Sequence, residues 1–361
     1  MRTWSGLSSV LLFFVACGTP KMIPVGTLVD APCSQSSVVL DGLNNSSVYF
    51  GLSTVGDDVF FAWRQNGAPP SKIDRVHRNG SRRTTLYTSP DDQLIHSLTA
   101  SGNDLYFLQA IGNAPATVGL FRIAASGGAP TQIGSTEWTG AKLVAVVSGR
   151  AYLRVTQDQG AQYERVDFAR ETSTIFAKIA GVGTPIEDQI VGGELYFAAA
   201  PAGGSLNLYH VSTSAAEATP VSLGTVGGQD CLAAGGTFVT PSKLVCGLGD
   251  IEAFDHHGVM PQTLLEKNLL HLRSVVATDG ENLYVAERGD GRNDVGLSRI
   301  DTSASDLNPV GCVRRLLSQY DDGLHPDPNR VQVTLSATEI FWFEQRIDGR
   351  NMSVSLRRAP K

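Results

Sequence analysis

The sequence predicts an all-β protein built from repeated four-stranded sheets, and three observations support this prediction. Glycine is abundant, with 38 among 361 residues, whereas methionine is scarce, with 4. The sequence lacks long runs of the helix-favouring residues Leu, Glu, Lys and Ala. Short segments rich in aromatic residues recur along the chain and alternate with turns rich in Gly, Asn and Asp. With 42% hydrophobic residues, the chain can also bury a large core.

The recurring unit contains two recognisable strands. The first strand usually carries an aromatic residue, and we expect it at 58–61, 104–107, 150–153, 194–197, 243–246, 282–285 and 339–342. The second follows at 73–76, 120–123, 163–166, 208–211, 251–254, 297–300 and 354–357. The ends of these second strands are separated by 47, 43, 45, 43, 46 and 57 residues. A period of about 40–50 residues with several short strands is typical of a β-propeller blade.

We therefore predict one β-propeller over residues 36–361, with seven four-stranded blades. Six blades are the alternative, because the unit around Cys231–Phe254 is irregular. The last unit has room for only three strands after Gln332, so we expect an N-terminal strand at 37–40 or 47–50 to complete it. Ring closure of this kind removes exposed sheet edges. The wider final spacing predicts an insertion at about Asp306–Asn329.

The N-terminus has the pattern of an export signal. Arg2 precedes the apolar run Val10–Ala16, which is too short to span a bilayer, and the run ends at Cys17. This arrangement resembles the lipobox of bacterial lipoproteins, although Phe14 stands where Leu is usual. The resemblance implies a signal peptide at 1–16, acylation of Cys17 and a tether at 17–35. The alternative is an ordinary cleaved signal with an incidental cysteine.

The resemblance to bacterial lipoproteins also implies a location in the cell envelope. Gly18 follows the cysteine, where some lipoproteins carry an Asp that retains them in the inner membrane. An outer-membrane lipoprotein is therefore expected, on the periplasmic or the exterior side. Acyl chains such as palmitate would provide its only contact with the membrane.

Four further cysteines follow Cys17, and an even number in an exported chain predicts two disulfides. Three connectivities are possible. We pair Cys231 with Cys246, because they are near in sequence and we expect them on neighbouring strands, which leaves Cys33 with Cys312. Free buried thiols are the alternative.

Several kinds of chemistry are not supported by the sequence. The motifs G-x-S-x-G, H-E-x-x-H and G-x-x-x-x-G-K-[ST] do not occur. Propellers that bind a quinone cofactor carry a Trp motif in nearly every blade, and this chain lacks it. The adjacent His256 and His257 would point to opposite faces of a strand, so we predict neither a metal nor a cofactor. The net charge of −6 argues against a nucleic-acid partner.

Acidic residues gather at the junctions between repeats. In a propeller these junctions lead into the innermost strands and surround one mouth of the central channel, so their carboxylates could bind a cation, a basic peptide or an amine-bearing ligand. The candidate ligand-binding residues are Asp92, His96, Asp188, Asp230 and Asp322. The alternative is a set of solvated turns, in which Asp is favoured for local hydrogen bonds.

The repeat pattern resembles that of bacterial envelope β-propellers, including TolB-like and other repeat proteins rich in Tyr and Phe. The resemblance implies an architecture and little about activity, because propellers include enzymes, binders and scaffolds. No catalytic residue can be named from the sequence. We therefore predict a non-enzymatic binding or scaffold module for an envelope protein or another envelope component. The alternative is an exported hydrolase or lyase with its active site at the channel mouth.

Overall fold

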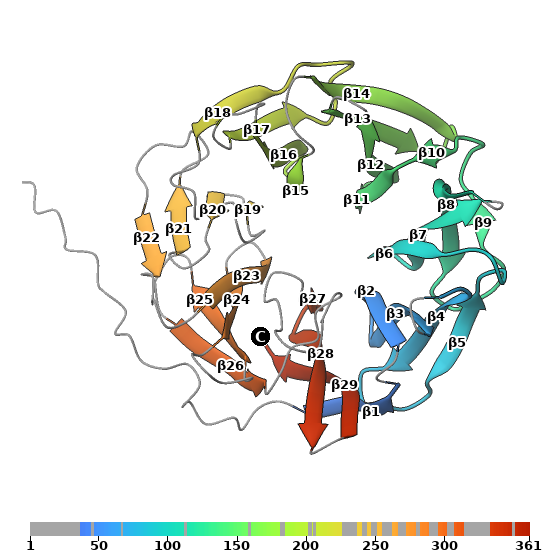
Figure 1. Ribbon diagram of the computed structural model, residues 1–361, viewed down its shortest axis with the longest axis vertical. Coiled ribbons are helices and arrows are strands. Elements are labelled where there is room, and N and C mark those ends of the chain that lie inside the picture. The colour runs from blue at the N-terminus through green and yellow to red at the C-terminus, as the bar shows by residue number, and fades with distance from the viewer. Residues whose placement is uncertain are drawn as a thin grey trace, which may run out of the picture.

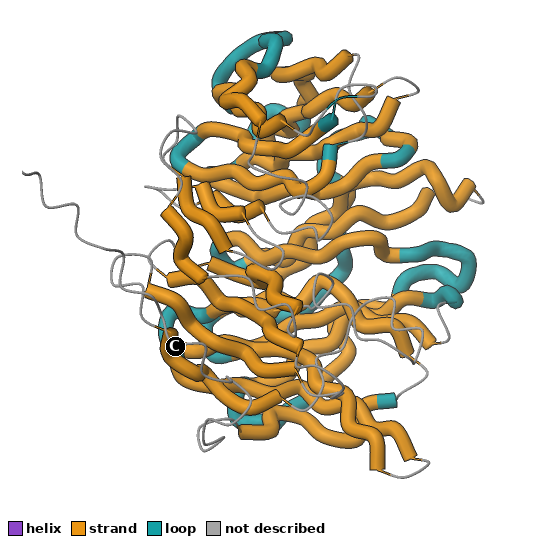
Figure 2. Tube along the Cα trace, turned by 60° about the vertical axis from the view of Figure 1, so that its left-hand side comes forward, coloured by secondary structure: helices purple, strands orange, loops and turns teal. Residues whose placement is uncertain are grey.

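The computed structural model describes most of the chain after its N-terminal segment. The described residues are 37–44, 47–65, 68–111, 114–157, 160–180, 185–200, 204, 207–225, 237–239, 244–246, 251–254, 262–265, 272–278, 282–288, 295–301, 307–313, 333–348 and 351–361. Across these ranges the chain forms strands joined by turns and loops, without a helix (Figure 2). This part of the chain accordingly has no helix of the length and hydrophobicity needed to cross a membrane.

The described strands form seven antiparallel sheets, numbered here as sheets 1 to 6 in chain order and followed by a closing sheet. Sheet 1 contains β2 (Ser47–Val55), β3 (Asp58–Gln65), β4 (Ser71–His77) and β5 (Thr84–Thr88). Sheet 2 contains β6 (Ile95–Ser101), β7 (Asp104–Ile111), β8 (Ala114–Ala124), β9 (Thr131–Gln132) and β10 (Trp138–Thr139). Sheet 3 contains β11 (Ala141–Val147), β12 (Arg150–Gln157), β13 (Gly160–Asp167) and β14 (Thr172–Ala180).

The second half of the chain continues the same order. Sheet 4 contains β15 (Ile186–Val191), β16 (Glu194–Ala199), β17 (Asn207–Ser212) and β18 (Val221–Thr225). Sheet 5 contains β19 (Thr237–Val239), β20 (Leu244–Cys246), β21 (Ile251–Phe254) and β22 (Gln262–Leu265). Sheet 6 contains β23 (Leu272–Thr278), β24 (Asn282–Arg288), β25 (Val295–Asp301) and β26 (Leu307–Val313). The closing sheet contains β1 (Ser37–Leu43), β27 (Val333–Leu335), β28 (Glu339–Asp348) and β29 (Asn351–Pro360).

The sheets stand around a ring, as expected for a β-propeller (Figure 1). In each of sheets 1 to 6 the chain starts at the strand nearest the centre and moves towards the rim (Figure 1). Neighbouring inner strands contact one another around the whole ring, from β2 and β6 to β27 and β2. Every strand pair expected from the repeat is present as two adjacent antiparallel strands, so the prediction of an all-β propeller is confirmed.

The repeated aromatic residues form the core because each sheet is covered on both faces. Phe60 packs with Leu105 and Phe107 of sheet 2, whereas its neighbour Phe61 packs with Phe343 of the closing sheet. Successive strand residues point to opposite faces, so a buried strand between two sheets needs apolar residues at consecutive positions. The Phe60-Phe61 pair therefore contributes to two separate hydrophobic clusters.

The N-terminal strand completes the last sheet. β1 pairs antiparallel with β29, and Val38 lies opposite Arg357 in this register. The expected closure by an N-terminal strand is thus confirmed. The turn after β4 packs against β1, because Gly80 has φ +85° and a Cβ at this position would lie 2.1 Å from the carbonyl oxygen of Val39. The ring is closed by strand pairing together with this close backbone contact.

One expected feature is corrected at the outer edge of sheet 6. The segment Leu307–Val313 forms strand β26, although it lies within the predicted insertion. The wider spacing of the last repeat suggests that the extra residues begin here, but Leu307–Val313 pairs with β25 as the edge strand, where Pro309 is tolerated because one side of the strand has no pairing partner. The other residues of the predicted insertion lie outside the described part of the chain.

Candidate functional site

The strongest candidate site is a cluster of four polar side chains between sheets 3 and 4, which we call the Asp188 cluster. Asp188 is on the inner strand β15, and its carboxylate accepts hydrogen bonds from Lys142 Nζ at 3.0 Å and Arg154 Nη1 at 2.8 Å. The hydroxyl of Tyr163 donates to its other oxygen. Arg154 also donates to the carbonyl oxygen of Pro185, in the connection that enters β15. The Asp188 cluster therefore joins two blades near the channel.

Strand pairing explains how sheet 3 directs three donors at one carboxylate. Lys142 pairs with Arg154 across β11 and β12, and Arg154 pairs with Tyr163 across β12 and β13. Directly paired residues of adjacent strands lie on the same face of a sheet. The three side chains thus form one row that runs outward from the inner strand, and the row faces Asp188 of the next sheet.

The Asp188 cluster departs from the repeat. At the position of Arg154, the other described sheets carry Ala62, Leu108, Ala198, Ala286 and Phe343. The residues paired with them, equivalent to Tyr163, are Ile73, Leu120, Leu208, Leu297 and Leu356. The residues equivalent to Asp188 on the inner strands are Leu98, Leu143, Val275, Val333 and, in sheet 5, Thr237. Among the sheets compared, this junction is therefore distinguished by charged residues at the positions of Arg154 and Asp188 and by a hydroxyl group at the position of Tyr163.

Exposure decreases from the solvent end of the Asp188 cluster inward. The side chain of Lys142 is 48% exposed, that of Arg154 is 14% exposed and that of Asp188 is fully buried. Burial, assisted by the negative charge of Asp188, raises the pKa of the Tyr163 hydroxyl well above its ordinary value of 10. Tyr163 is therefore an uncharged hydrogen-bond donor at neutral pH and is not a general base.

Other buried carboxylates of the described chain have different partners. Asp74 accepts from Arg83 and Thr85 within sheet 1, and Glu344 pairs with Arg357 in the closing sheet. Glu164 accepts only from uncharged groups: Trp138 at 2.8 Å, Ser173 at 2.5 Å and Gln162 at 2.7 Å. Asp188 differs from Asp74 and Glu164 in having two cationic partners among the described residues.

Two more of the predicted ligand-binding residues lie at the entrance to sheet 2. Asp92 is exposed in the turn between β5 and β6, and His96 is exposed on β6. Buried hydroxyls hold this connection in place, because Ser71 Oγ accepts from the backbone N–H of Ile95 at 3.1 Å and Ser89 Oγ donates to the carbonyl of Gln93 at 2.7 Å. The inner strand of sheet 3 lies between β6 and β15, so these residues belong to a different junction from Asp188.

Several predicted residues lie outside the described part of the chain. Asp230 and Asp322 are among them, as are Cys17, Cys33 and Cys231. Cys246 and Cys312 fall in β20 and β26, but their side chains are not described. The lipidation site, the two disulfides and these two acidic residues therefore stay predictions.

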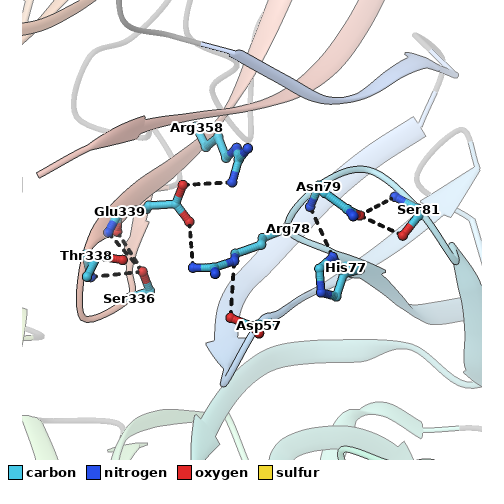
Figure 3. A network of polar contacts seen from close by, with 9 residues as sticks. All are labelled: Asp57, His77, Arg78, Asn79, Ser81, Ser336, Thr338, Glu339 and Arg358. Carbon is cyan, nitrogen blue, oxygen red and sulfur yellow. Dashed lines mark hydrogen bonds and ion pairs between the residues drawn. The ribbon is translucent and has the colours of Figure 1, made fainter.

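A second polar network lies where the ring closes, between the closing sheet and sheet 1 (Figure 3). Glu339 accepts from Arg358 Nη1 at 2.8 Å and lies 3.6 Å from Arg78 Nη1, which belongs to the turn after β4. Arg78 also pairs with Asp57 at 3.1 Å, while Arg358 Nε donates to Ser37 Oγ at 3.1 Å. Two carboxylates and two guanidinium groups balance in charge, so the network acts as an ionic clasp at the junction that β1 completes.

Similar arginine contacts join other blades. Arg75 donates to the carbonyl of Ala125 in the next sheet at 3.3 Å, and Arg165 donates to the carbonyl of Thr213 at 2.5 Å. Both arginines pair in register with an aromatic residue of the preceding strand, Phe60 and Tyr152 respectively. These arginines connect blades and do not form a ligand site. Within the described chain, no group of three or more His, Cys, Asp or Glu residues could hold a metal ion.

The signal for the partners of Asp188 is present in the sequence but requires an alignment of the repeats. Arg154 and Tyr163 occur where other units have small or apolar residues, and Lys142 precedes the apolar Leu143 on the inner strand. Acidic residues at the repeat junctions predicted Asp188 as a candidate, but they did not indicate the three residues that bind it. The cluster as a whole presents an exposed ammonium group with a guanidinium behind it, which is suited to an anion rather than a cation.

Comparison with known proteins supports the fold. No protein-family model matches the chain, and no curated protein matches it significantly in sequence. Among solved structures, it is similar to the β-propeller domain of the Trilobed protease from Pyrococcus furiosus, with 8% identity over 83% of this chain and 92% of that chain and a TM-score of 0.56. A Mycobacterium tuberculosis puromycin-hydrolyzing peptidase gives 13% identity and a TM-score of 0.54, covering 82% of this chain and 49% of that chain.

An oligogalacturonate lyase in complex with manganese is also similar, with 12% identity and a TM-score of 0.50. This match covers 89% of the present chain and 98% of the lyase chain. The chain thus spans about half the length of the mycobacterial peptidase but nearly the whole length of the lyase. At these identities the similarities show a shared β-propeller fold.

Proposed function

We propose that the protein is an exported, lipid-anchored hydrolase or lyase that acts on a polymer at the channel mouth of the propeller. The Asp188 cluster is the observation that carries this proposal. It places charged groups on the inner strands β11 and β15 and on β12, where the other sheets compared carry uncharged residues. Departures of this kind from a repeated pattern are expected at functional sites.

The similar structures support an enzymatic function over a purely structural one. Their names describe peptidases and a lyase, all of which act on bonds of a substrate. The lyase is matched over 98% of its chain, whereas the protease match is to the propeller domain of a larger enzyme, so a saccharide polymer is the substrate class we favour. Asp92 and His96 would border the same mouth from sheet 2, and Asp230 and Asp322 complete the set of candidates.

The second candidate is a non-enzymatic module that presents one propeller face to an envelope protein or another envelope component. It is favoured by the sequence, which lacks the nucleophile and metal motifs sought above. It is also favoured by the paired state of Asp188, because both oxygens of its carboxylate are already engaged by Lys142, Arg154 and Tyr163.

Two experiments on the full chain test the two functions. The purified protein is incubated with saccharide polymers and with polypeptides, and chain cleavage is followed by new reducing ends, new amino groups and absorbance of unsaturated products. We expect cleavage of a saccharide polymer. If none of the polymers tested is cleaved, the enzymatic proposal is contradicted. In-cell crosslinking with mass spectrometry, compared with a Cys17→Ala control, would then support the scaffold function if one partner is recovered in near-equal amount.

The lipid anchor has its own test. Cells grown with radiolabelled palmitate should incorporate the label into the wild-type chain and not into the Cys17→Ala variant. Equal labelling of both chains, or labelling of neither, would refute acylation at Cys17.

A further inference from the structure

We propose that Lys142 and Arg154 bind the carboxylate of an acidic sugar in the polymer, an inference that rests on the proposed function and specifies its substrate. The charge balance of the Asp188 cluster is the first reason. Lys142 and Arg154 bring two positive charges to one carboxylate, and Tyr163 is uncharged at neutral pH. One positive charge is therefore left over within the cluster, in contrast to the balanced clasp at the ring closure.

Stability does not explain why the cluster is polar. Buried ion pairs can be replaced by well-packed apolar residues at little or no cost. The other described sheets show this replacement within the same chain, because they hold Leu, Ile, Ala or Phe in the row of Arg154 and Tyr163. A charged row is therefore not required for packing two blades, and the surplus positive charge of the cluster is the property that an anionic ligand would use.

The geometry exposes one cation, Lys142, and buries the anion. Lys142 is the second residue of β11 and is half exposed, whereas the Asp188 carboxylate is fully buried behind the two cations. A ligand that approaches from solvent meets the ammonium group first. Arg154 has 14% of its side chain exposed; its Nη1 is engaged by Asp188 and Pro185, and its Nε is buried without a hydrogen-bond partner in the described structure, so the guanidinium group has unused donor capacity.

Binding of a uronate trisaccharide tests the inference. Isothermal titration calorimetry compares trigalacturonate with galactotriose, its neutral counterpart, on the wild-type full chain and on variants. We expect Lys142→Met to weaken binding of trigalacturonate by about tenfold or more, as for loss of a hydrogen bond between charged groups, and to leave galactotriose unaffected. Lys178→Met is the matched control, because Lys178 is equally exposed in the same sheet and pairs with Glu217 on the rim.

A second variant should act in the opposite direction. Asp188→Asn removes the competing negative charge and keeps the side-chain size, so we expect trigalacturonate to bind more tightly than to the wild type. A purely structural cluster would not produce opposite effects from Lys142→Met and Asp188→Asn. If Asp188→Asn does not fold, as judged by circular dichroism, Lys142→Arg replaces it and should retain most of the affinity because the charge is kept.

The outcomes separate this inference from the proposed function. Failure of trigalacturonate to bind the wild type, equal binding of the neutral trisaccharide, or equal effects of Lys142→Met and Lys178→Met would overturn the carboxylate subsite. Binding of a glutamate-rich peptide in place of trigalacturonate, with the same dependence on Lys142, would overturn the assignment to a sugar. Polymer cleavage that does not depend on Lys142 would support the proposed enzymatic function and refute the carboxylate subsite. Binding of trigalacturonate that depends on Lys142, without polymer cleavage, would support the subsite and refute the enzymatic function.

Discussion

The closure of the ring by β1 can be tested at Gly80. This residue has φ +85°, a conformation that disfavours any residue with a Cβ, and its replacement by Ala would place a Cβ 2.1 Å from the carbonyl oxygen of Val39. The left-handed backbone costs about 1–2 kcal/mol. The clash adds about 1–3 kcal/mol, because the obstructing atom belongs to the backbone of a paired strand and cannot rotate away. We expect Gly80→Ala to lower the free energy of unfolding by about 3 kcal/mol.

Thermal unfolding followed by circular dichroism measures this loss. For a chain of this size, 1 kcal/mol corresponds to a shift in Tm of about 1.5 °C, so Gly80→Ala should unfold about 4–5 °C below the wild type. Gly56→Ala is the matched control in the same sheet, since Gly56 has φ +56° but nothing within 4 Å of its Cβ position. It should show only the backbone cost of about 1–2 kcal/mol. Equal losses in the two variants would refute the close packing of the turn against β1.

Two further predictions concern charged and titratable groups. In urea unfolding, Glu339→Gln should lower the free energy of unfolding by about 1 kcal/mol, a value reduced by the partial exposure of Arg78, and this loss should shrink in 1 M salt. The control Glu217→Gln, whose partner Lys178 is exposed, should lower it by less than about 0.5 kcal/mol. A larger loss for Glu217→Gln would contradict a special role for the ionic network at the ring closure. Burial raises the pKa of Tyr49 from 10 to about 12, so the unfolded chain releases this proton at a lower pH than the folded chain. The stability linked to this proton is complete below pH 10 and is lost as the pH rises towards 12, so Tyr49→Phe should lose less stability than the wild type over this interval in urea unfolding. An unchanged alkaline profile in the variant would argue against the burial of this hydroxyl.

The strands were predictable because their signals are local. Each repeat contains consecutive apolar residues, such as Phe60-Phe61, because each sheet is covered on both faces. Turns with Gly and Asn, such as Asn79-Gly80, mark where these strands reverse. The missing strand of the last repeat also predicted closure by an N-terminal segment, which β1 provides. By contrast, β26 was not predicted, because its edge position tolerates the Pro that argues against a strand elsewhere.

The candidate site was only partly predictable. Asp188 was recognised as an acidic residue at a junction between repeats, but its role was expected to be that of a free carboxylate for a cationic ligand. Its partners Lys142, Arg154 and Tyr163 come from three strands of the preceding sheet. The residues most informative about the site are therefore the ones that break the repeat, and a list of acidic residues does not reveal them.

The sequence by itself determined the β-propeller architecture, the order of its strands and the closure of the ring by an N-terminal strand, because hydrophobic periodicity and turn chemistry act within a few residues of one another. Tertiary structure alone decided which side chains meet across each junction. Lys142 and Asp188 are 46 positions apart in the chain, and their contact depends on strand register. A register shift between Ile186 and Asp188 affects which face of β15 presents the carboxylate, and a shift of one residue turns every side chain to the opposite face. The charge of the site is therefore set by how the blades pack.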